Sequence, residues 1–253
     1  MIINTESERR GIHEAAYTVM DIMAFALDYV TPGITTRELD EHINTYIEMS
    51  DAESAPKVFY DFPSYTCISI NEEVAHGVAG NRVILQEDLV KIDISIRDRN
   101  GYCADMCRTV YFGHDPVRQH LVNVAKQCVH TVIGNLKAGD SVNKIGQIID
   151  EVAFKNRVFV EERLTGHGIG RHIHESPTIP NTFNLSKLLP AHELSPGEVI
   201  CIEPIIFQSR TSVHMNEYVY VSETGAHAAQ YEDMVIVTED GTDNLTGDIQ
   251  WNM

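Results

Sequence analysis

The stretch Thr165-Gly166-His167-Gly168-Ile169-Gly170-Arg171-His172-Ile173-His174-Glu175 places three histidines and three glycines within eleven residues. Glycine lets a backbone turn tightly and lets other chain segments approach closely. Histidine is a frequent metal ligand and a frequent acid or base in catalysis. The stretch therefore predicts a functional site, and the groups that act with His167 and His174 must come from elsewhere in the chain.

The composition narrows the classes of protein to consider. The chain has 19 Lys and Arg against 37 Asp and Glu, and its net charge is −18. This charge argues against nucleic acid or an anionic membrane as a partner, and it permits metal ions or a peptide amino terminus. No stretch approaches the roughly 18–20 apolar residues of a membrane span. The acidic start also lacks the features of a signal peptide.

The cysteines indicate the compartment. They are odd in number and none are in a Cys-x-x-Cys arrangement, which argues against a structural zinc site. We expect buried thiols in a reducing environment and a cytoplasmic protein. The five cysteines are Cys67, Cys103, Cys107, Cys128 and Cys201.

Hydrophobic periodicity predicts two pairs of helices and several strands. Residues 9–30 carry apolar side chains three and four positions apart, and Pro32-Gly33 ends that helix. Thr35 or Thr36 can cap a second helix. A second pair of helices is expected at residues 117–136 and 145–154. Strands are expected at residues 67–70, 90–96, 102–112, 198–204, 218–221 and 232–238.

The two halves of the chain share a series of landmarks. Each half has a glycine-containing turn between two helices, then a His-Gly pair, then two strand carboxylates. We expect one domain over residues 1–253, with a pseudo-repeat relating about 9–115 to 116–239 and a short tail at 240–253. Coincidence between short patterns is the alternative. The paired landmarks are His76-Gly77 with His167-Gly168, Asp93 with Glu203, and Asp105 with Glu232.

The carboxylates predict a metal centre. Asp93 and Glu203 lie in the most apolar runs of the chain, where an unpaired charge is costly. A metal ion is the expected partner, and four carboxylates with a histidine suit Mn²⁺, Fe²⁺, Co²⁺ or Zn²⁺. The combined negative charge predicts two ions, which activate water and polarise a carbonyl. Hydrolysis is therefore expected, with Asp93, Asp105, His167, Glu203 and Glu232 as candidate ligands.

Four motifs resemble those of the methionine aminopeptidases: His-Gly-x-Gly within residues 166–170, Ile202-Glu203-Pro204, Gln230-Tyr231-Glu232, and two aspartates around the Asn100-Gly101 turn. The resemblance extends from about residue 8 to residue 239 and is closer to the bacterial type I enzymes than to the prolidases. It implies a pita-bread fold of the α+β class. Such a fold has a pseudo-two-fold antiparallel sheet core covered by two pairs of helices.

The resemblance also implies roles for individual residues. Asp93 would chelate one metal ion, while Asp105 and Glu232 would bridge two. His167 and Glu203 would complete the shell of the second ion, and Glu203 would move a proton. Two further histidines would act on the substrate: His174 would stabilise the oxyanion, and His76 would bond the peptide nitrogen or neighbouring backbone.

For the substrate, the resemblance implies release of the N-terminal methionine from peptides and nascent polypeptides. It further implies a monomer in transient contact with the ribosome. The pocket wall matches residues 59–67, where sulfur and aromatic side chains would suit an unbranched apolar side chain. Simple core packing is the alternative for these aromatic residues. The expected lining residues are Phe59, Phe62, Tyr65, Cys67, Ile173 and Tyr218.

The chain departs from the family in several places. One extra residue lies between Asp93 and Asp105, Met106-Cys107 replaces a small hydroxylated pair, and the loop 208–225 is different. Because all five ligands are present, hydrolysis is a stronger expectation than methionine specificity. Two other hypotheses stay open: a pita-bread peptidase of another N-terminal preference, such as X-Pro, and a non-catalytic pita-bread binding protein.

Overall fold

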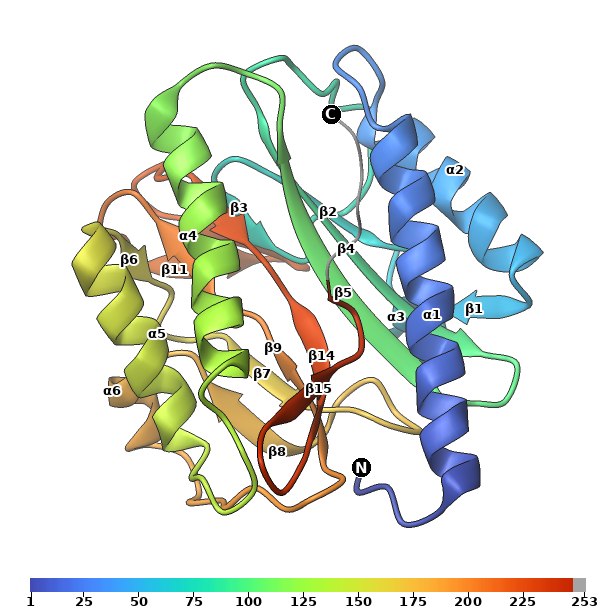
Figure 1. Ribbon diagram of the computed structural model, residues 1–253. Coiled ribbons are helices and arrows are strands. Elements are labelled where there is room, and N and C mark those ends of the chain that lie inside the picture. The colour runs from blue at the N-terminus through green and yellow to red at the C-terminus, as the bar shows by residue number, and fades with distance from the viewer. Residues whose placement is uncertain (248–253) are drawn as a thin grey trace.

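The computed structural model describes residues 1–247. Two pairs of helices flank a set of antiparallel strands (Figure 1). One pair is α1 (Glu6–Tyr29) with α2 (Thr36–Met49), and the other is α4 (Pro116–Ile133) with α5 (Asn143–Asn156). Within the described residues, no helix is both long and apolar enough to span a membrane. The expected mixture of helices and antiparallel sheets is confirmed.

Capping explains where the first helices begin. The Thr5 side chain accepts the Glu8 backbone N–H, and the Glu8 carboxylate accepts that of Thr5. Thr35 and Glu38 form the same reciprocal pair at α2, so Thr35 is the cap. Each such box satisfies two donors that the first helical turn leaves free. The helix α4 ends at Ile133 with Gly134 as its C-cap, three residues before the expected end at residue 136.

All the strands pair in antiparallel fashion. One sheet contains β1 (Ala52–Ser54), β2 (Cys67–Ile70), β4 (Leu89–Asp98) and β5 (Cys103–Tyr111). A second contains β7 (Thr165–Gly168), β8 (Glu175–Pro180), β9 (Val199–Ile202), β14 (Asp233–Val237) and β15 (Thr242–Asn244).

Two smaller three-stranded sheets complete the described strands. One contains β6 (Phe159–Val160), β10 (Ile205–Phe207) and β13 (Ala228–Gln230). The other contains β3 (Glu73–Ala75), β11 (Val213–Asn216) and β12 (Val219–Ser222). Two short helices, α3 (Ala55–Tyr60) and α6 (Phe183–Ser186), lie between strands. The sequence did not predict most of these short elements.

The hairpin of β4 and β5 is the longest pairing among the described strands. Nine consecutive residue pairs join the two strands, from Leu89 opposite Tyr111 to Arg97 opposite Cys103. Gly101 has a φ of +79°, a conformation that suits glycine, and the Asp98 carboxylate accepts the Tyr102 backbone N–H at 2.7 Å. The predicted Asn-Gly turn is confirmed.

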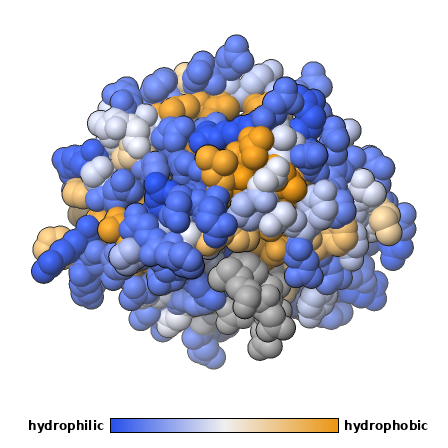
Figure 2. Space-filling model, turned by 90° about the horizontal axis from the view of Figure 1, so that it is seen from above, coloured by the Kyte–Doolittle hydropathy of each residue, from blue (hydrophilic) through white to orange (hydrophobic). Residues whose placement is uncertain are grey.

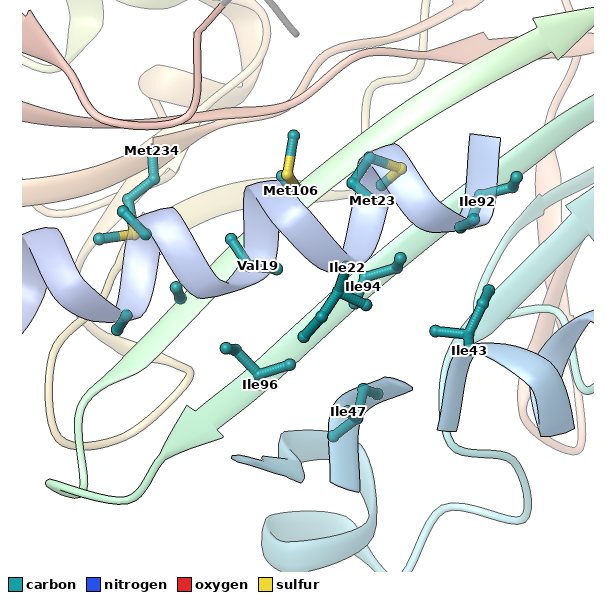
Figure 3. Packing of buried hydrophobic residues seen from close by; sticks show 14 of the residues in the cluster. Val19, Ile22, Met23, Ile43, Ile47, Ile92, Ile94, Ile96, Met106 and Met234 are labelled. Atoms are coloured by element: carbon teal, nitrogen blue, oxygen red, sulfur yellow. The ribbon is translucent and has the colours of Figure 1, made fainter. Parts of the chain in front are cut away.

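Each helix pair covers its own apolar core. Side chains of α1 and α2 pack on β4 and β5, as Figure 3 shows for Ile22 beside Ile94. A second cluster joins α4 and α5 to β9 and β14. By contrast, hydrophilic residues dominate the face of the molecule in Figure 2, interrupted by a few apolar patches. This surface agrees with the large net negative charge.

Arg108 joins the two large sheets in the interior. It extends from β5, and its Nη2 atom lies 2.7 Å from Asp233 Oδ1 on β14. The guanidinium also donates to the backbone oxygens of Glu232 at 2.6 Å and Thr246 at 2.7 Å. Arg108 is 4% exposed and Asp233 is fully buried. These hydrogen bonds therefore compensate both charged groups for the hydration that they lose on folding.

Part of the expected tail belongs to the fold. β15 pairs with β14, Leu245 is buried, and Thr246 accepts the bond from Arg108. The expectation of a tail beginning at residue 240 is therefore wrong for residues 242–246, because they cover and bond to the second large sheet. The remainder of that tail, with Trp251, lies outside the described residues.

We predict that Arg108→Met lowers the free energy of unfolding by about 3–5 kcal/mol, because it leaves the buried Asp233 carboxylate without its partner. Urea denaturation of the metal-free protein measures the change. Arg99→Met is the matched control, since Arg99 and Asp51 form an exposed pair 3.8 Å apart. It should change stability by less than about 0.5 kcal/mol. Equal effects of the two substitutions would contradict the role given to Arg108.

Candidate metal centre and substrate pocket

The structure brings all five candidate ligands to one place. Oxygen atoms of Asp93, Asp105 and Glu232 lie within 4.8 Å of one another. His167 Nε2 is 3.3 Å from Glu203 Oε1 and 3.8 Å from Asp105 Oδ2. These residues come from both halves of the chain. The tertiary structure therefore assembles the cluster from segments separated by as many as 139 positions in sequence.

Strand register explains why the two aspartates meet. Asp93 lies opposite Cys107 in the hairpin, and Asp105 is two residues from Cys107 on the same strand. Diagonal neighbours of this kind share one face of a sheet. Ser95 lies opposite Asp105, and its hydroxyl donates to Asp105 Oδ1 at 2.9 Å. The hairpin therefore presents both carboxylates on the same side.

The other ligands stand at strand ends. Glu203 directly follows β9, which stops before Pro204 because proline cannot donate to a sheet. Glu232 directly precedes β14, and its backbone N–H donates to Cys107 O at 3.0 Å. His167 lies within β7, and its Nδ1 is 3.0 Å from Gly168 O. That contact leaves Nε2 directed at the carboxylates.

The cluster carries strongly perturbed acids. Burial, followed by the charge of neighbouring carboxylates, raises the pKa values of Asp93 and Glu232 well above their usual range. Burial likewise raises the pKa of Asp105 to about 6. Burial acts to lower the pKa of His167, but the contacts with Glu203 and Asp105 outweigh it and raise that pKa. These groups repel one another unless protons or cations are present.

A divalent metal ion fits this arrangement. Glu232 is 2% exposed, and its Oε1 atom has no hydrogen-bond partner among the described residues. A buried charged oxygen without a partner is costly. Carboxylates combined with an imidazole are the donor set of borderline divalent ions. The chemistry of the donors and the orphaned oxygen both point to a cation at this position.

The cluster forms part of the wall of a cavity of about 780 Å³. Four of the expected substrate-pocket residues line it, namely Phe62, Cys67, Ile173 and Tyr218. The rings of Phe62 and Tyr218 meet edge to face, with centroids 5.6 Å apart. The cavity therefore has both a charged and an apolar part.

Phe59 and Tyr65 are corrections to the expected lining. Phe59 packs against the core beneath α1 and tilts against the His172 ring, 5.4 Å between centroids. Tyr65 places its ring near Lys57 Nζ, and its backbone N–H donates to Asp40 at 3.1 Å. Successive residues of a helix point about 100° apart, so in α3 Tyr60, rather than Phe59, lines the cavity.

The two remaining histidines line the same cavity. His76 has a φ of +55°, and burial lowers its pKa. His174 stands perpendicular to the His167 ring, with centroids 4.4 Å apart. Burial, followed by the charges of His167 and His76, lowers the pKa of His174 to about 4. Both groups are therefore neutral near pH 7, which suits hydrogen bonding to a substrate.

Two residues at the site were not selected from sequence. The Tyr60 hydroxyl lies 2.5 Å from His174 Nδ1, although its place in an aromatic cluster was the only signal. Gln230 Nε2 donates to Glu203 Oε2 at 3.4 Å, and it belongs to the Gln-Tyr-Glu motif. His172 is 70% exposed at its side chain, in agreement with its omission from the expected site.

Curated relatives match nearly the whole chain. A methionine aminopeptidase of Staphylococcus epidermidis is 37% identical over 247 residues, which is 95% of this chain and 96% of the relative. A methionine aminopeptidase of Treponema pallidum is 34% identical over 250 residues, covering 96% of this chain and 95% of the relative. The predicted resemblance to this group of enzymes is confirmed.

Solved structures support the fold. A methionine aminopeptidase from Rickettsia prowazekii aligns with a TM-score of 0.90 at 28% identity, over 98% of this chain and all of that one. A prolidase from Pyrococcus furiosus shares the fold at 24% identity and a TM-score of 0.78, and this chain covers 66% of it. The predicted pita-bread fold is confirmed. A model of metallopeptidase family M24 matches residues 10–239, and the chain belongs to that family.

Proposed function

We propose that this protein is a methionine aminopeptidase, which removes the N-terminal methionine from peptides and nascent polypeptides. One observation carries the proposal: four carboxylates and an imidazole converge beside an apolar recess in a single cavity. The charged part suits hydrolysis and the apolar part suits a single side chain. The strong likeness to methionine aminopeptidases over the whole chain supports the same activity.

The metal centre would hold two divalent ions, chosen from Mn²⁺, Fe²⁺, Co²⁺ and Zn²⁺. Asp93 would hold one ion, while Asp105 and Glu232 would be shared between two. His167 and Glu203 would complete the second position. Ions held in this way lower the pKa of water toward 7 and polarise a carbonyl. The orphaned Glu232 Oε1 and the crowded carboxylates support this assignment.

Glu203 is the group that moves the proton. Its side chain is 15% exposed, so it reaches the cavity while its neighbours on β9 are buried. It would accept a proton from the attacking water and deliver it to the nitrogen of the scissile peptide bond, which becomes the new amino terminus of the shortened peptide. Gln230 donates to one of its oxygens and restricts the carboxylate to an orientation facing His167.

The remaining residues would bind the substrate. His174 would donate a hydrogen bond to the oxygen of the scissile carbonyl, where negative charge develops. His76 would bond the peptide nitrogen or the neighbouring backbone. Phe62, Cys67 and Tyr218 would surround the methionine side chain, whose flexible thioether packs well against aromatic rings and sulfur.

A peptide panel tests the proposed specificity. We expect Met-Ala-Ser to be cleaved in the presence of Mn²⁺ or Co²⁺, with free methionine as the product. Matched peptides that begin with Leu, Ala or Ala-Pro should be cleaved far more slowly, because aromatic rings and sulfur would favour the flexible thioether of methionine. Chromatography of the released amino acid is the measurement. Release of another residue in preference to methionine would overturn the specificity.

Glu203→Gln should abolish turnover while it leaves the fold unchanged, because the amide matches the carboxylate in shape but cannot accept the proton. The readouts are the rate of methionine release and the circular dichroism spectrum. Glu239→Gln serves as a control, since Glu239 lies beyond β14 and outside the cavity. Near-normal activity of Glu203→Gln would remove its assigned role.

Metal addition should stabilise the purified, chelator-treated protein. A ligand at about 100 times its Kd adds about 2.7 kcal/mol to the free energy of unfolding, which thermal denaturation detects. The increase should be larger at pH 7.5 than at pH 5.5. The raised pKa values of the cluster, about 6 for Asp105, mean that protons compete with the metal at the lower pH. Glu232→Gln should lose most of the increase, and a full increase in that variant would contradict the ligand set.

A further inference from the structure

Tyr60 connects the first half of the chain to a histidine from the second half. It is the last residue of α3, and its hydroxyl lies 2.5 Å from Nδ1 of His174, which belongs to the segment between β7 and β8. Their ring centroids are 5.4 Å apart with a 38° tilt. Asp61 ends α3 in a left-handed conformation, and its backbone N–H donates to Pro56 O. The helix end that carries Tyr60 is therefore anchored.

The hydrogen bond matters because of what a neutral imidazole can do. A neutral ring has one nitrogen that donates and one that accepts. If Nδ1 accepts from Tyr60, the proton is on Nε2, which can donate into the cavity. If Nδ1 carries the proton, Nε2 is an acceptor and would repel a developing oxyanion. The partner of Nδ1 thus decides the chemical role of Nε2.

The surroundings favour Tyr60 as the donor. Burial and the nearby Asp105 charge raise the pKa of Tyr60, which keeps its phenol protonated. The rings of His174 and His167 are perpendicular, with centroids 4.4 Å apart, and no second partner for His174 Nδ1 occurs among the described residues. Tyr60 is 54% exposed, so its hydroxyl lies beside His174 without being enclosed by the core.

We propose that Tyr60 is a positioning residue, whose hydroxyl donates to Nδ1 of His174 and so holds the ring proton on Nε2. This inference rests on the proposed function, in which His174 donates to the carbonyl oxygen of the substrate. Tyr60 itself does not touch the reacting atoms. It sets which of the two nitrogens of His174 can donate toward them, and it does so from a helix in the opposite half of the chain.

Tyr60→Phe is the decisive variant, because it retains the ring contact and removes only the hydroxyl. We expect kcat for Met-Ala-Ser to fall about 3–10-fold, the cost of one neutral hydrogen bond, while KM changes less than about 2-fold. His174→Ala should lower kcat about 10²–10³-fold, as for the loss of an oxyanion donor. In the His174→Ala background, Tyr60→Phe should have no further effect. An equal fall in both backgrounds would show that Tyr60 acts independently of His174.

Nitrogen-15 NMR of histidine-labelled protein reads the tautomer without any turnover. The His174 signals are identified by their loss in His174→Ala. We expect the Nε2–H form in the wild type and a shift toward the Nδ1–H form in Tyr60→Phe. Tyr29→Phe is the matched control, since Tyr29 stacks on His42 at 3.5 Å between centroids and neither residue lines the cavity. It should change neither the spectrum of His174 nor kcat.

The outcomes separate this inference from the proposed function. If methionine peptides are cleaved but wild-type His174 carries its proton on Nδ1, the role of Tyr60 is overturned and the proposed function stands. The same holds if Tyr60→Phe leaves both kcat and the tautomer unchanged. If the tautomer shifts as expected but no methionine is released by any form, the positioning contact is supported and the proposed function fails.

Discussion

The burial of several carboxylates at one point is the constraint on which the rest of the structure depends. Burial, followed by the charge of neighbouring carboxylates, raises the pKa values of Asp93 and Glu232, and burial raises the pKa of Asp105 to about 6. One Glu232 oxygen has no partner among the described residues. Burying several carboxylate charges close together costs free energy unless they are neutralised. The arrangement becomes favourable when protons or cations neutralise the carboxylates, so the fold keeps this preformed cluster at a cost in folding free energy.

The surrounding fold holds these acids in place against their repulsion. The long β4–β5 hairpin carries two of them on a single face. Arg108 extends from this hairpin to bond the backbone of Glu232 and the side chain of Asp233. The two apolar cores lie on either side, each beneath its own pair of helices (Figure 1). The site therefore lies where the two halves meet, and the buried hydrogen bonds of Arg108 lie there too.

Residues from both halves of the chain also line the apolar part of the cavity. α3 and β2 contribute Tyr60 and Cys67 from the first half, while the segment after β7 contributes Ile173 and His174 from the second. Under the proposed function, side chains that would bind the substrate thus line the same cavity as those that would act on the carbonyl. The contact between Tyr60 and His174 crosses this boundary. Through it, a hydroxyl from the first half can determine which nitrogen of a second-half histidine carries the proton.

The sequence by itself determined the long helices, the β4–β5 hairpin and the candidate ligands. These features depend on periodicity, caps and turn residues that act over a few positions, or on motifs with a specific order along the chain. Only the tertiary structure decided that β15 completes a sheet, that Phe59 faces the core and that Tyr60 reaches His174. Short strands form through pairing with distant partners, and the direction of a helical side chain depends on how the helix docks. Both are set by contacts between residues far apart in sequence, which no local pattern records.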